Sequence, residues 1–256
     1  MTVRTERVGS VLIIQLDRPQ KRNAIDLDMA VALDAAIEEL EAGDDLRVGL
    51  LTASGSVFCA GTDMSDRRDK RTARGGEYGL LRRERTKPLI AVVDGAALGG
   101  GFEIVLACDM VVASDRAQFG LPETRRGLVA TGGGLFRAGR ALPQHIAAEM
   151  LLTGLRLDAH RAFALGLVNR VLPSAGLTAG ALELAKAVVH GGPHATAETL
   201  TALRGFTGQD DHLGWWVTGR AKRMVADHPE ADEGRTAFFE GRLPAWVAED
   251  PDETER

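Results

Sequence analysis

The sequence is poor in cysteine and in aromatic residues. Only two cysteines, Cys59 and Cys108, occur among 256 residues, which is too few for a disulfide framework. Both have apolar neighbours, so we expect buried thiols in a reducing compartment and a cytoplasmic protein. Aromatic residues make up 5% of the chain, whereas glycine occurs 30 times. Tight turns and close backbone approaches are therefore favoured over aromatic stacking platforms.

Long uncharged apolar runs are also missing. No such run approaches the ~18 residues that a membrane-spanning helix requires, and residues 1–8 carry charges where a signal peptide would need an apolar stretch. We therefore expect neither secretion nor membrane insertion. The hydrophobic share of 45% and the charged share of 26% predict a globular chain with one large domain, or one domain with a small appendage.

Positive charge is in deficit, because 31 Lys and Arg face 36 Asp and Glu, a net charge of −5. This balance disfavours a nucleic-acid partner, so local groups must hold any anionic ligand. The sequence also lacks a phosphate-binding Gly-Lys-Ser/Thr loop, a Gly-x-Gly-x-x-Gly after a strand and a Gly-x-Ser-x-Gly elbow. His190 and His194 cannot share a helical face across Gly191-Gly-Pro193, so no metal site is predicted.

Strands and helices alternate along the first 120 residues, which predicts an α/β fold with parallel pairing and crossover helices. The expected elements are a hairpin at 2–17, a helix at 26–41 and strands at 46–52, 89–93 and 110–113. After about residue 143 the pattern becomes helical. The helices expected there span 145–153, 158–165, 177–190, 195–206, 213–227 and 229–241. The very polar stretch 66–76 is interpreted as a mobile, solvated surface loop.

Two glycine-bearing segments, 57–64 and 94–103, each follow a predicted strand. The second leads into an apolar helix, whose free N–H groups would point at a ligand oxygen placed over Gly100. Glu103 stands in the first turn of that helix among apolar residues. Partial burial would raise its pKa and allow proton exchange near neutral pH. Taken alone, each segment is better explained by a glycine turn that packs a helix on a sheet, without any ligand.

Taken together, the motifs resemble the enoyl-CoA hydratase/isomerase family, the crotonases. They keep that family's order and cover nearly the whole chain. The matching pieces are Asp17-Arg-Pro-Gln-Lys-Arg-Asn-Ala24, Phe58-Cys-Ala-Gly-Thr-Asp63, Asp94-Gly-Ala-Ala-Leu-Gly-Gly-Gly-Phe-Glu103, Ala107-Cys-Asp109, Phe119-Gly-Leu-Pro-Glu123, Gly166-Leu-Val-Asn169 and Phe238-Phe-Glu-Gly-Arg-Leu-Pro-Ala-Trp246.

The resemblance implies a β-β-α spiral of two roughly perpendicular sheets ringed by helices. We expect the spiral core at 1–195 and a helical region at 196–256. In the family, this C-terminal region covers the site and builds trimers, which commonly stack as hexamers. A homotrimer or hexamer is thus the implied assembly.

The resemblance also implies the catalytic groups. The backbone N–H groups of Thr62 and Gly100 would form an oxyanion hole for a thioester carbonyl. Hydratases that use two glutamates have them at the positions of Glu103 and Glu123, and both are present. The implied reaction is syn addition of water to a 2-enoyl-CoA, with the acid and base roles left open between them. No separate cofactor is implied, because coenzyme A is part of the substrate.

Further positions would contact the substrate. Arg22 and Ala24 would lie near the adenine and ribose, although Arg22 is equally explained as a solvated arginine. Leu98 and Pro122 would line the acyl pocket, and Thr131 would orient the water. The remaining implied substrate contacts are Ala60, Asp63, Met64 and Gly99.

Departures from the family pattern bear on the substrate. Ala130 and Thr131 stand where many hydratases have proline and glycine, which predicts a narrower or more polar pocket around the β-carbon. Gly241 precedes Arg242 where lysine is frequent, which weakens one expected coenzyme A contact. The stretch 101–109 is closer to carnitinyl-CoA dehydratase-like members. The alternatives to a hydratase are therefore carnitinyl-CoA dehydration, Δ-isomerisation and non-catalytic binding of acyl-CoA, the last disfavoured by the two acids.

Overall fold

A computed structural model describes residues 2–208, 211–226 and 228–247. Its largest sheet has six strands in the order β1-β2-β3-β7-β9-β12. Only the first pair, β1 with β2, is antiparallel. The strands are β1 (Val3–Val8), β2 (Val11–Leu16), β3 (Val48–Ala53), β7 (Leu89–Val93), β9 (Met110–Ser114) and β12 (Arg170–Leu172). The α/β fold with parallel pairing and the hairpin at 2–17 are thus confirmed.

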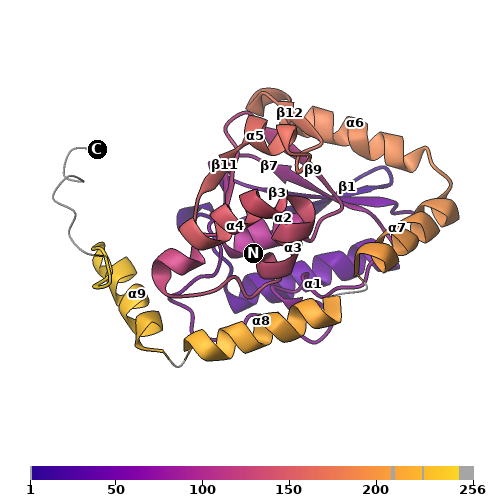
Figure 1. The fold of residues 1–256 in the computed structure, drawn as a ribbon. Helices are drawn as coiled ribbons and strands as arrows, with labels where there is room; N and C mark the ends of the chain where they lie inside the picture. Colours follow the sequence, from indigo (N-terminus) through magenta and orange to yellow (C-terminus); the bar gives the residue numbers. More distant parts are fainter. Residues whose placement is uncertain (1, 209–210, 227, 248–256) are drawn as a thin grey trace.

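Helices cover both faces of this sheet, α1 on one and α6 on the other (Figure 1). The alternation along β2 explains why: Leu12 and Ile14 join the core that includes α1, whereas Val11 joins the core that includes α6. The helix α1 (Leu27–Ala42) begins where the Asp26 side chain accepts a hydrogen bond from the Met29 N–H. The helix α6 spans Leu177–Val189.

A second sheet of four strands, in the order β11-β10-β8-β4, positions the site. Its strands are β4 (Val57–Cys59), β8 (Ala96–Leu98), β10 (Gln118–Gly120) and β11 (Arg156–Asp158). Because β4, β8 and β10 run parallel, the segments that follow them emerge at the same edge. These segments begin at residues 60, 99 and 121, so the sheet gathers the candidate site residues.

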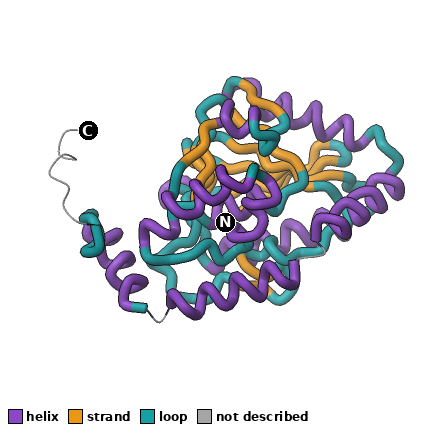
Figure 2. The backbone as a smooth tube through the Cα atoms, in the orientation of Figure 1, coloured by secondary structure: helices purple, strands orange, loops and turns teal. Residues whose placement is uncertain are grey.

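The remaining helices lie around the two sheets and at the end of the chain (Figure 2). They are α2 (Gly100–Leu106), α3 (Gly134–Ala141), α4 (Gln144–Thr153), α5 (Ala159–Ala164), α7 (Pro193–Gly208), α8 (Asp211–Ala226) and α9 (Pro229–Glu240), with short 3₁₀ turns η1 (Pro19–Lys21), η2 (Glu123–Arg126) and η3 (Ser174–Gly176). None of the helices in the described ranges is long and apolar enough to cross a membrane.

The helix α9 packs directly on η2 through glycines on both sides. A Cβ atom added at Gly127 would lie 2.4 Å from the carbonyl oxygen of Glu230. One added at Gly234 would lie 2.2 Å from the carbonyl oxygen of Arg126. The guanidinium of Arg126 also stands 4.5 Å from the ring centroid of Phe238. The two backbones are therefore in contact with no room for side chains between them.

The structure corrects the sequence prediction at two places. The stretch 66–76 is not loop throughout, since β5 (Arg71–Thr72) pairs with β6 (Gly76–Glu77). The helix α3 was not predicted, because Gly134 and Gly139 give its eight residues a weak helical signal. The six later helices are confirmed within a few residues, apart from position 227, which lies outside the described residues.

Candidate active site

Two backbone N–H groups face the site where the segments after β4 and β8 meet. The carbonyl of Ile25 accepts a hydrogen bond from the N–H of Asp63, and the N–H of Ile25 donates to the carbonyl of Gly61. The N–H of Thr62, which lies between these two bonds, therefore points away from Ile25. Gly100 is the first residue of α2, where a helical N–H has no partner in its own helix. Within the described chain, neither N–H has a backbone acceptor. The two predicted oxyanion donors are therefore both free.

Glycine is required here because the chain segments touch. A Cβ atom at Gly61 would lie 3.1 Å from the Gly100 nitrogen, and one at Gly101 would lie 2.3 Å from the carbonyl oxygen of Cys59. Gly99 has a φ of +54°, which side chains rarely tolerate. The glycine run thus brings the start of α2 against the segment that carries Thr62.

Glu103 is buried on α2 with 2% of its surface exposed. Its Oε1 accepts a hydrogen bond of 2.9 Å from the Gly134 N–H. Burial, followed by the charge of Glu123, raises the pKa of Glu103 above its ordinary value, although hydrogen bonds from Gly134 and Gly132 oppose the shift. A Cβ atom at Gly132 would lie 2.4 Å from Oε2. The glycines at 132 and 134 therefore leave room for this carboxyl group.

Glu123 opens η2 and completes the pair. Burial raises the pKa of Glu123 as well. Its Oε2 is buried and has no hydrogen-bond partner among the described residues. Glu103 and Glu123 line the same cavity of about 200 Å³, together with Thr62 and Thr131. The structure thus brings together residues 61 positions apart in the chain, as the resemblance implied.

Two carboxyl groups in one water-poor cavity resist simultaneous ionisation. With both pKa values raised, the pair holds a proton at pH values where an exposed glutamate has lost it. One protonated and one ionised carboxyl side by side can act as acid and base on a single substrate.

The raised pKa of Glu103 predicts how the stability of the fold depends on pH. Because the native pKa of Glu103 is raised, its protonated form stabilises the fold at low pH, and that contribution is lost as the pH rises through the native pKa. We expect Glu103→Gln to melt close to the unchanged protein below pH ~4 and to exceed it by a margin that grows up to the native pKa of about 8 and is constant above it. Thermal melts across pH measure this difference, and a gap that does not grow with pH would contradict it.

Tyr78 is a site residue that sequence analysis missed. It is the only tyrosine of the chain, and it adopts a left-handed φ of 57°. Its hydroxyl lies 2.7 Å from Oγ1 of Thr62, and its ring packs over Gly100, where a Cβ atom would lie 2.5 Å from the hydroxyl oxygen. Burial, with the charge of Glu103, raises the pKa of Tyr78 well above its ordinary value. The phenol therefore stays neutral beside the oxyanion donors.

We expect Tyr78→Phe to lower kcat/KM by about fivefold, because a net hydrogen bond contributes ~1 kcal/mol. Thr62→Val removes the other partner but keeps the backbone N–H. If the two hydroxyls act through their mutual bond, the double variant should lose little more than either single variant. Fully additive losses in steady-state kinetics would argue that the two hydroxyls act separately.

The residues expected to contact coenzyme A and those expected to line the acyl pocket, Leu98 and Pro122, lie in different surroundings. The carbonyl of Arg22 accepts a hydrogen bond of 3.0 Å from the N–H of Ala60, so these segments lie side by side. Arg22 is exposed, while Ala24 and Met64 are half-buried. Leu98 and Pro122, by contrast, line neither of the two cavities described for this face.

The carboxylate of Asp63 is bound by other side chains of this protein. Its carboxylate pairs with Arg18 at 2.7 Å and accepts hydrogen bonds from Ser65. Burial alone would raise the pKa of Asp63, but the bonds from Ser65 and Arg18 lower it to about 2. The side chain therefore fixes the segment that carries Thr62, while the N–H of Asp63 pairs with Ile25.

No group of three or more His, Cys, Asp or Glu side chains in the described part of the chain could hold a metal ion. Cys59 is buried and Cys108 is half-buried, and burial raises the pKa of both thiols to about 12. Neither thiol is therefore activated as a nucleophile near neutral pH.

Comparison with known proteins places this site in a family. A sequence model described as enoyl-CoA hydratase/isomerase matches residues 6–249. The chain belongs to this family. It is 38% identical to a mevalonyl-coenzyme A hydratase of Aspergillus fumigatus, over 92% of this chain and 91% of that protein. It is 37% identical to a carnitinyl-CoA dehydratase of Proteus mirabilis, over 93% and 95%.

Solved structures agree with this assignment. A carnitinyl-CoA dehydratase from Mycobacterium avium superposes with a TM-score of 0.90 at 38% identity, covering 96% of this chain and 99% of that one. The crotonase-type fold expected from the sequence motifs is thus confirmed, and it extends over nearly the whole described chain.

Proposed function

We propose that this enzyme is an enoyl-CoA hydratase that reversibly adds water to a 2-enoyl-CoA thioester. The observation that carries the proposal is the pair of carboxyl groups in one cavity, Glu103 buried and Glu123 half-buried, with the buried Oε2 of Glu123 left without a hydrogen-bond partner among the described residues. Membership of the enoyl-CoA hydratase/isomerase family supports the thioester substrate and the hydro-lyase class.

The reaction balances with the groups present. The ionised carboxyl of the pair accepts a proton from water as the water oxygen bonds to the β-carbon. The π electrons of the α,β double bond move into the thioester, and the carbonyl oxygen becomes an oxyanion that accepts hydrogen bonds from the N–H groups of Thr62 and Gly100. The protonated carboxyl then delivers its proton to the α-carbon, which yields the 3-hydroxyacyl-CoA. Thr131, at the wall of the same cavity, orients the water.

Coenzyme A enters this scheme as part of the substrate. The edge formed by exposed Arg22 and half-buried Ala24 and Ala60 leads to Thr62, and Met64 and Gly99 are near the two donors in the chain. Backbone groups along this edge would hold the pantetheine arm, while Arg22 offers a charge near the nucleotide.

Dehydration of a carnitinyl-CoA-like thioester is the second candidate, because relatives at 37% and 38% identity carry that name. Dehydration would use Glu103 and Glu123 in the reverse of the hydration reaction. A double-bond isomerase or a non-catalytic acyl-CoA binder is less well supported, since neither needs two buried acids and a water-orienting residue at one cavity.

A panel of thioesters tests the proposal. Crotonyl-CoA, longer and branched 2-enoyl-CoA esters and crotonobetainyl-CoA are each incubated with the enzyme, and loss of the conjugated-thioester absorbance is followed. Hydration of at least one neutral 2-enoyl-CoA is expected. Binding without turnover across the whole panel would refute the hydratase and favour a binding protein.

The assembly we propose is a homotrimer or a hexamer built through the helical region at 196–256. Large apolar side chains exposed on α8, α9 and the turn after it support a buried interface there. They are Trp216, Met224, Phe238, Phe239 and Leu243. Light scattering of the purified protein measures the mass. The cysteine content favours a cytoplasmic location.

A further inference from the structure

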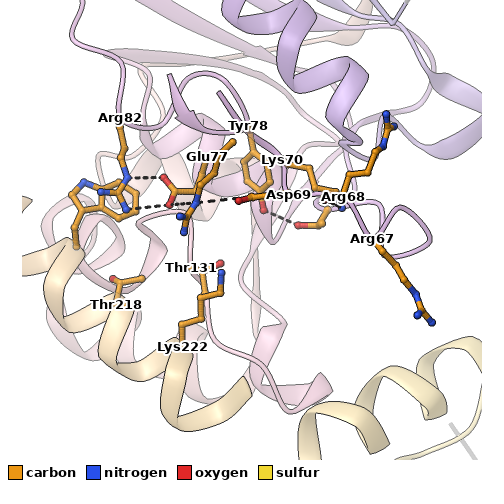
Figure 3. A pocket seen from close by; sticks show the side chains of 14 residues that line it. Arg67, Arg68, Asp69, Lys70, Glu77, Tyr78, Arg82, Thr131, Thr218 and Lys222 are labelled. Carbon is orange, nitrogen blue, oxygen red and sulfur yellow. Dashed lines mark hydrogen bonds and ion pairs between the residues drawn. The ribbon is translucent and has the colours of Figure 1, made fainter. Parts of the chain in front are cut away.

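A larger cavity of about 410 Å³ adjoins the one that holds the glutamates (Figure 3). Four residues line both cavities, namely Thr62, Tyr78, Thr131 and Lys222. A thioester with its carbonyl at Thr62 and its double bond between the glutamates would therefore extend its acyl group along this shared wall.

The larger cavity is strongly basic. Only Asp69 and Glu77 contribute carboxylates to its lining. The cationic side chains that line it are Arg67, Arg68, Lys70, Arg71, Arg82 and Lys222. This excess is unexpected in a chain with a net charge of −5.

Most of these cations are already engaged. Arg68 pairs with Asp66 at 3.0 Å. Arg71 and Arg82 both pair with Glu77, at 3.3 and 2.7 Å. The charges of these three arginines are therefore partly neutralised by carboxylates, of which Glu77 lies in the lining and Asp66 outside it.

The side chains of Lys70 and Arg67 lie outside these pairs, and Arg82 makes a second contact. Lys70 donates to the carbonyls of Asp66 and Arg68, and Arg82 also stacks on the ring of Trp215. The Arg67 side chain extends away from the other labelled residues (Figure 3).

Lys222 differs from the other cations in its position. It projects from α8 toward Thr131 at the junction of the two cavities (Figure 3). Among the residues that the structure describes, no carboxylate pairs with it. Its ammonium group thus offers a free positive charge just beyond the position of the reacting double bond.

We propose that the acyl group of the substrate ends in a carboxylate and that Lys222 binds it. This inference rests on the proposed function, since it places the α,β double bond between Glu103 and Glu123. The substrate class is a short 2-enedioyl-CoA monothioester, with one carboxyl in the thioester and the other free. An ammonium–carboxylate contact is a charge-assisted hydrogen bond, which is stronger than a neutral one.

The phosphates of coenzyme A are the other source of negative charge. They lie beyond the whole pantetheine arm from the thioester carbonyl. Lys222 shares a cavity with the two glutamates, so the acyl group reaches it and the phosphates do not. Thioesters of N-acetylcysteamine, which carry no phosphate, separate the two sources.

The positive charge of Lys222 disfavours binding of an acyl group that ends in a quaternary ammonium. A trimethylammonium group at the end of the acyl chain would bring like charge beside Lys222 and into a cavity with excess cations. The inference therefore distinguishes this enzyme from a carnitinyl-CoA dehydratase by substrate charge.

The test compares kcat/KM for pent-2-enoyl-CoA, glutaconyl-CoA and crotonobetainyl-CoA, which have similar length and end in a methyl group, a carboxylate and a trimethylammonium. A second carboxylate-terminated 2-enoyl-CoA ester, longer by one methylene group, tests a greater distance between the double bond and the carboxylate. We expect one of the two carboxylates to exceed the neutral ester by about tenfold, the typical effect of one partly exposed charged hydrogen bond. The trimethylammonium ester should be the poorest.

Variants connect this preference to the residue. In Lys222→Met, kcat/KM for the carboxylate ester should fall to that for the neutral ester. In Lys222→Glu, kcat/KM for the trimethylammonium ester should exceed that for the carboxylate ester. Lys186→Met, an exposed lysine on α6, is the matched control and should keep both ratios. The same ratios measured with N-acetylcysteamine esters should respond alike to Lys222→Met. A response seen only with full coenzyme A esters would assign Lys222 to the phosphates and overturn the inference.

The outcomes separate the two levels of the proposal. Hydration of the neutral ester with no preference for either carboxylate, or a preference that survives Lys222→Met, overturns the inference and leaves the hydratase standing. Absence of hydration on every ester refutes the hydratase. In that case calorimetric binding of saturated glutaryl-CoA against pentanoyl-CoA still tests Lys222, and equal affinities would overturn the inference.

Discussion

Replacing Glu103 by Gln should lower kcat by about 10²–10⁴-fold, the range typical of lost general acid–base catalysis. Glutamine keeps the size of the side chain and an oxygen that can accept the 2.9 Å hydrogen bond from Gly134. The variant therefore loses proton transfer without emptying the cavity. Binding of acyl-CoA should stay largely intact, so the loss appears in kcat rather than KM.

Glu123→Gln should show a loss of the same order, and the double variant should lose little beyond the larger single effect, because the two groups act in one step. Glu149→Gln, on the exposed face of α4, is the matched control and should hydrate normally. Steady-state kinetics on the best 2-enoyl-CoA measure all four proteins. Unchanged turnover in both site variants would remove the pair from the mechanism.

Gly100→Pro should produce the second large loss, because proline has no N–H to donate to the oxyanion. Removal of one such donor costs roughly 3–4 kcal/mol, or about 10²–10³ in kcat. Proline is tolerated at the first position of a helix, and Gly100 is the first residue of α2. The fold should therefore survive, which circular dichroism can verify.

Gly100→Ala isolates this effect. Both substitutions add a Cβ atom that must displace the Tyr78 ring, since its hydroxyl oxygen would lie at 2.5 Å. Only proline removes the N–H. We expect the alanine variant to lose activity moderately and the proline variant to fall well below it. Equal activities would show that crowding of Tyr78, rather than the missing donor, causes the loss.

The sequence predicted the fold wherever local pattern and core packing agree. The all-apolar run of β7 is buried on both faces, and Asp26 begins α1 as its side chain chemistry predicts. The pairing of Glu103 with Glu123 could not come from local pattern. It depends on the parallel order of β4, β8 and β10 in the second sheet, and before the structure only the family resemblance indicated that the two glutamates act together.

Residues whose roles depend on long-range packing were missed. Tyr78 stands just after a polar stretch that is typical of a surface loop, and only the fold brings its hydroxyl to Thr62. Lys222 is one cation among several on α8, with no local signal to distinguish it. The helix α3 has two glycines in eight residues and is stabilised by neighbours such as Trp215, whose ring lies 5.2 Å from that of Phe136.

The glycine contacts between α9 and η2 couple the position of α9 to that of the segment that carries Glu123. The backbones of α9 and η2 are in direct contact, because Gly127 and Gly234 place no side chain between them. A displacement of α9 would therefore also move η2, which begins at Glu123. The position of one catalytic carboxyl thus depends on a helix more than one hundred residues further along the chain.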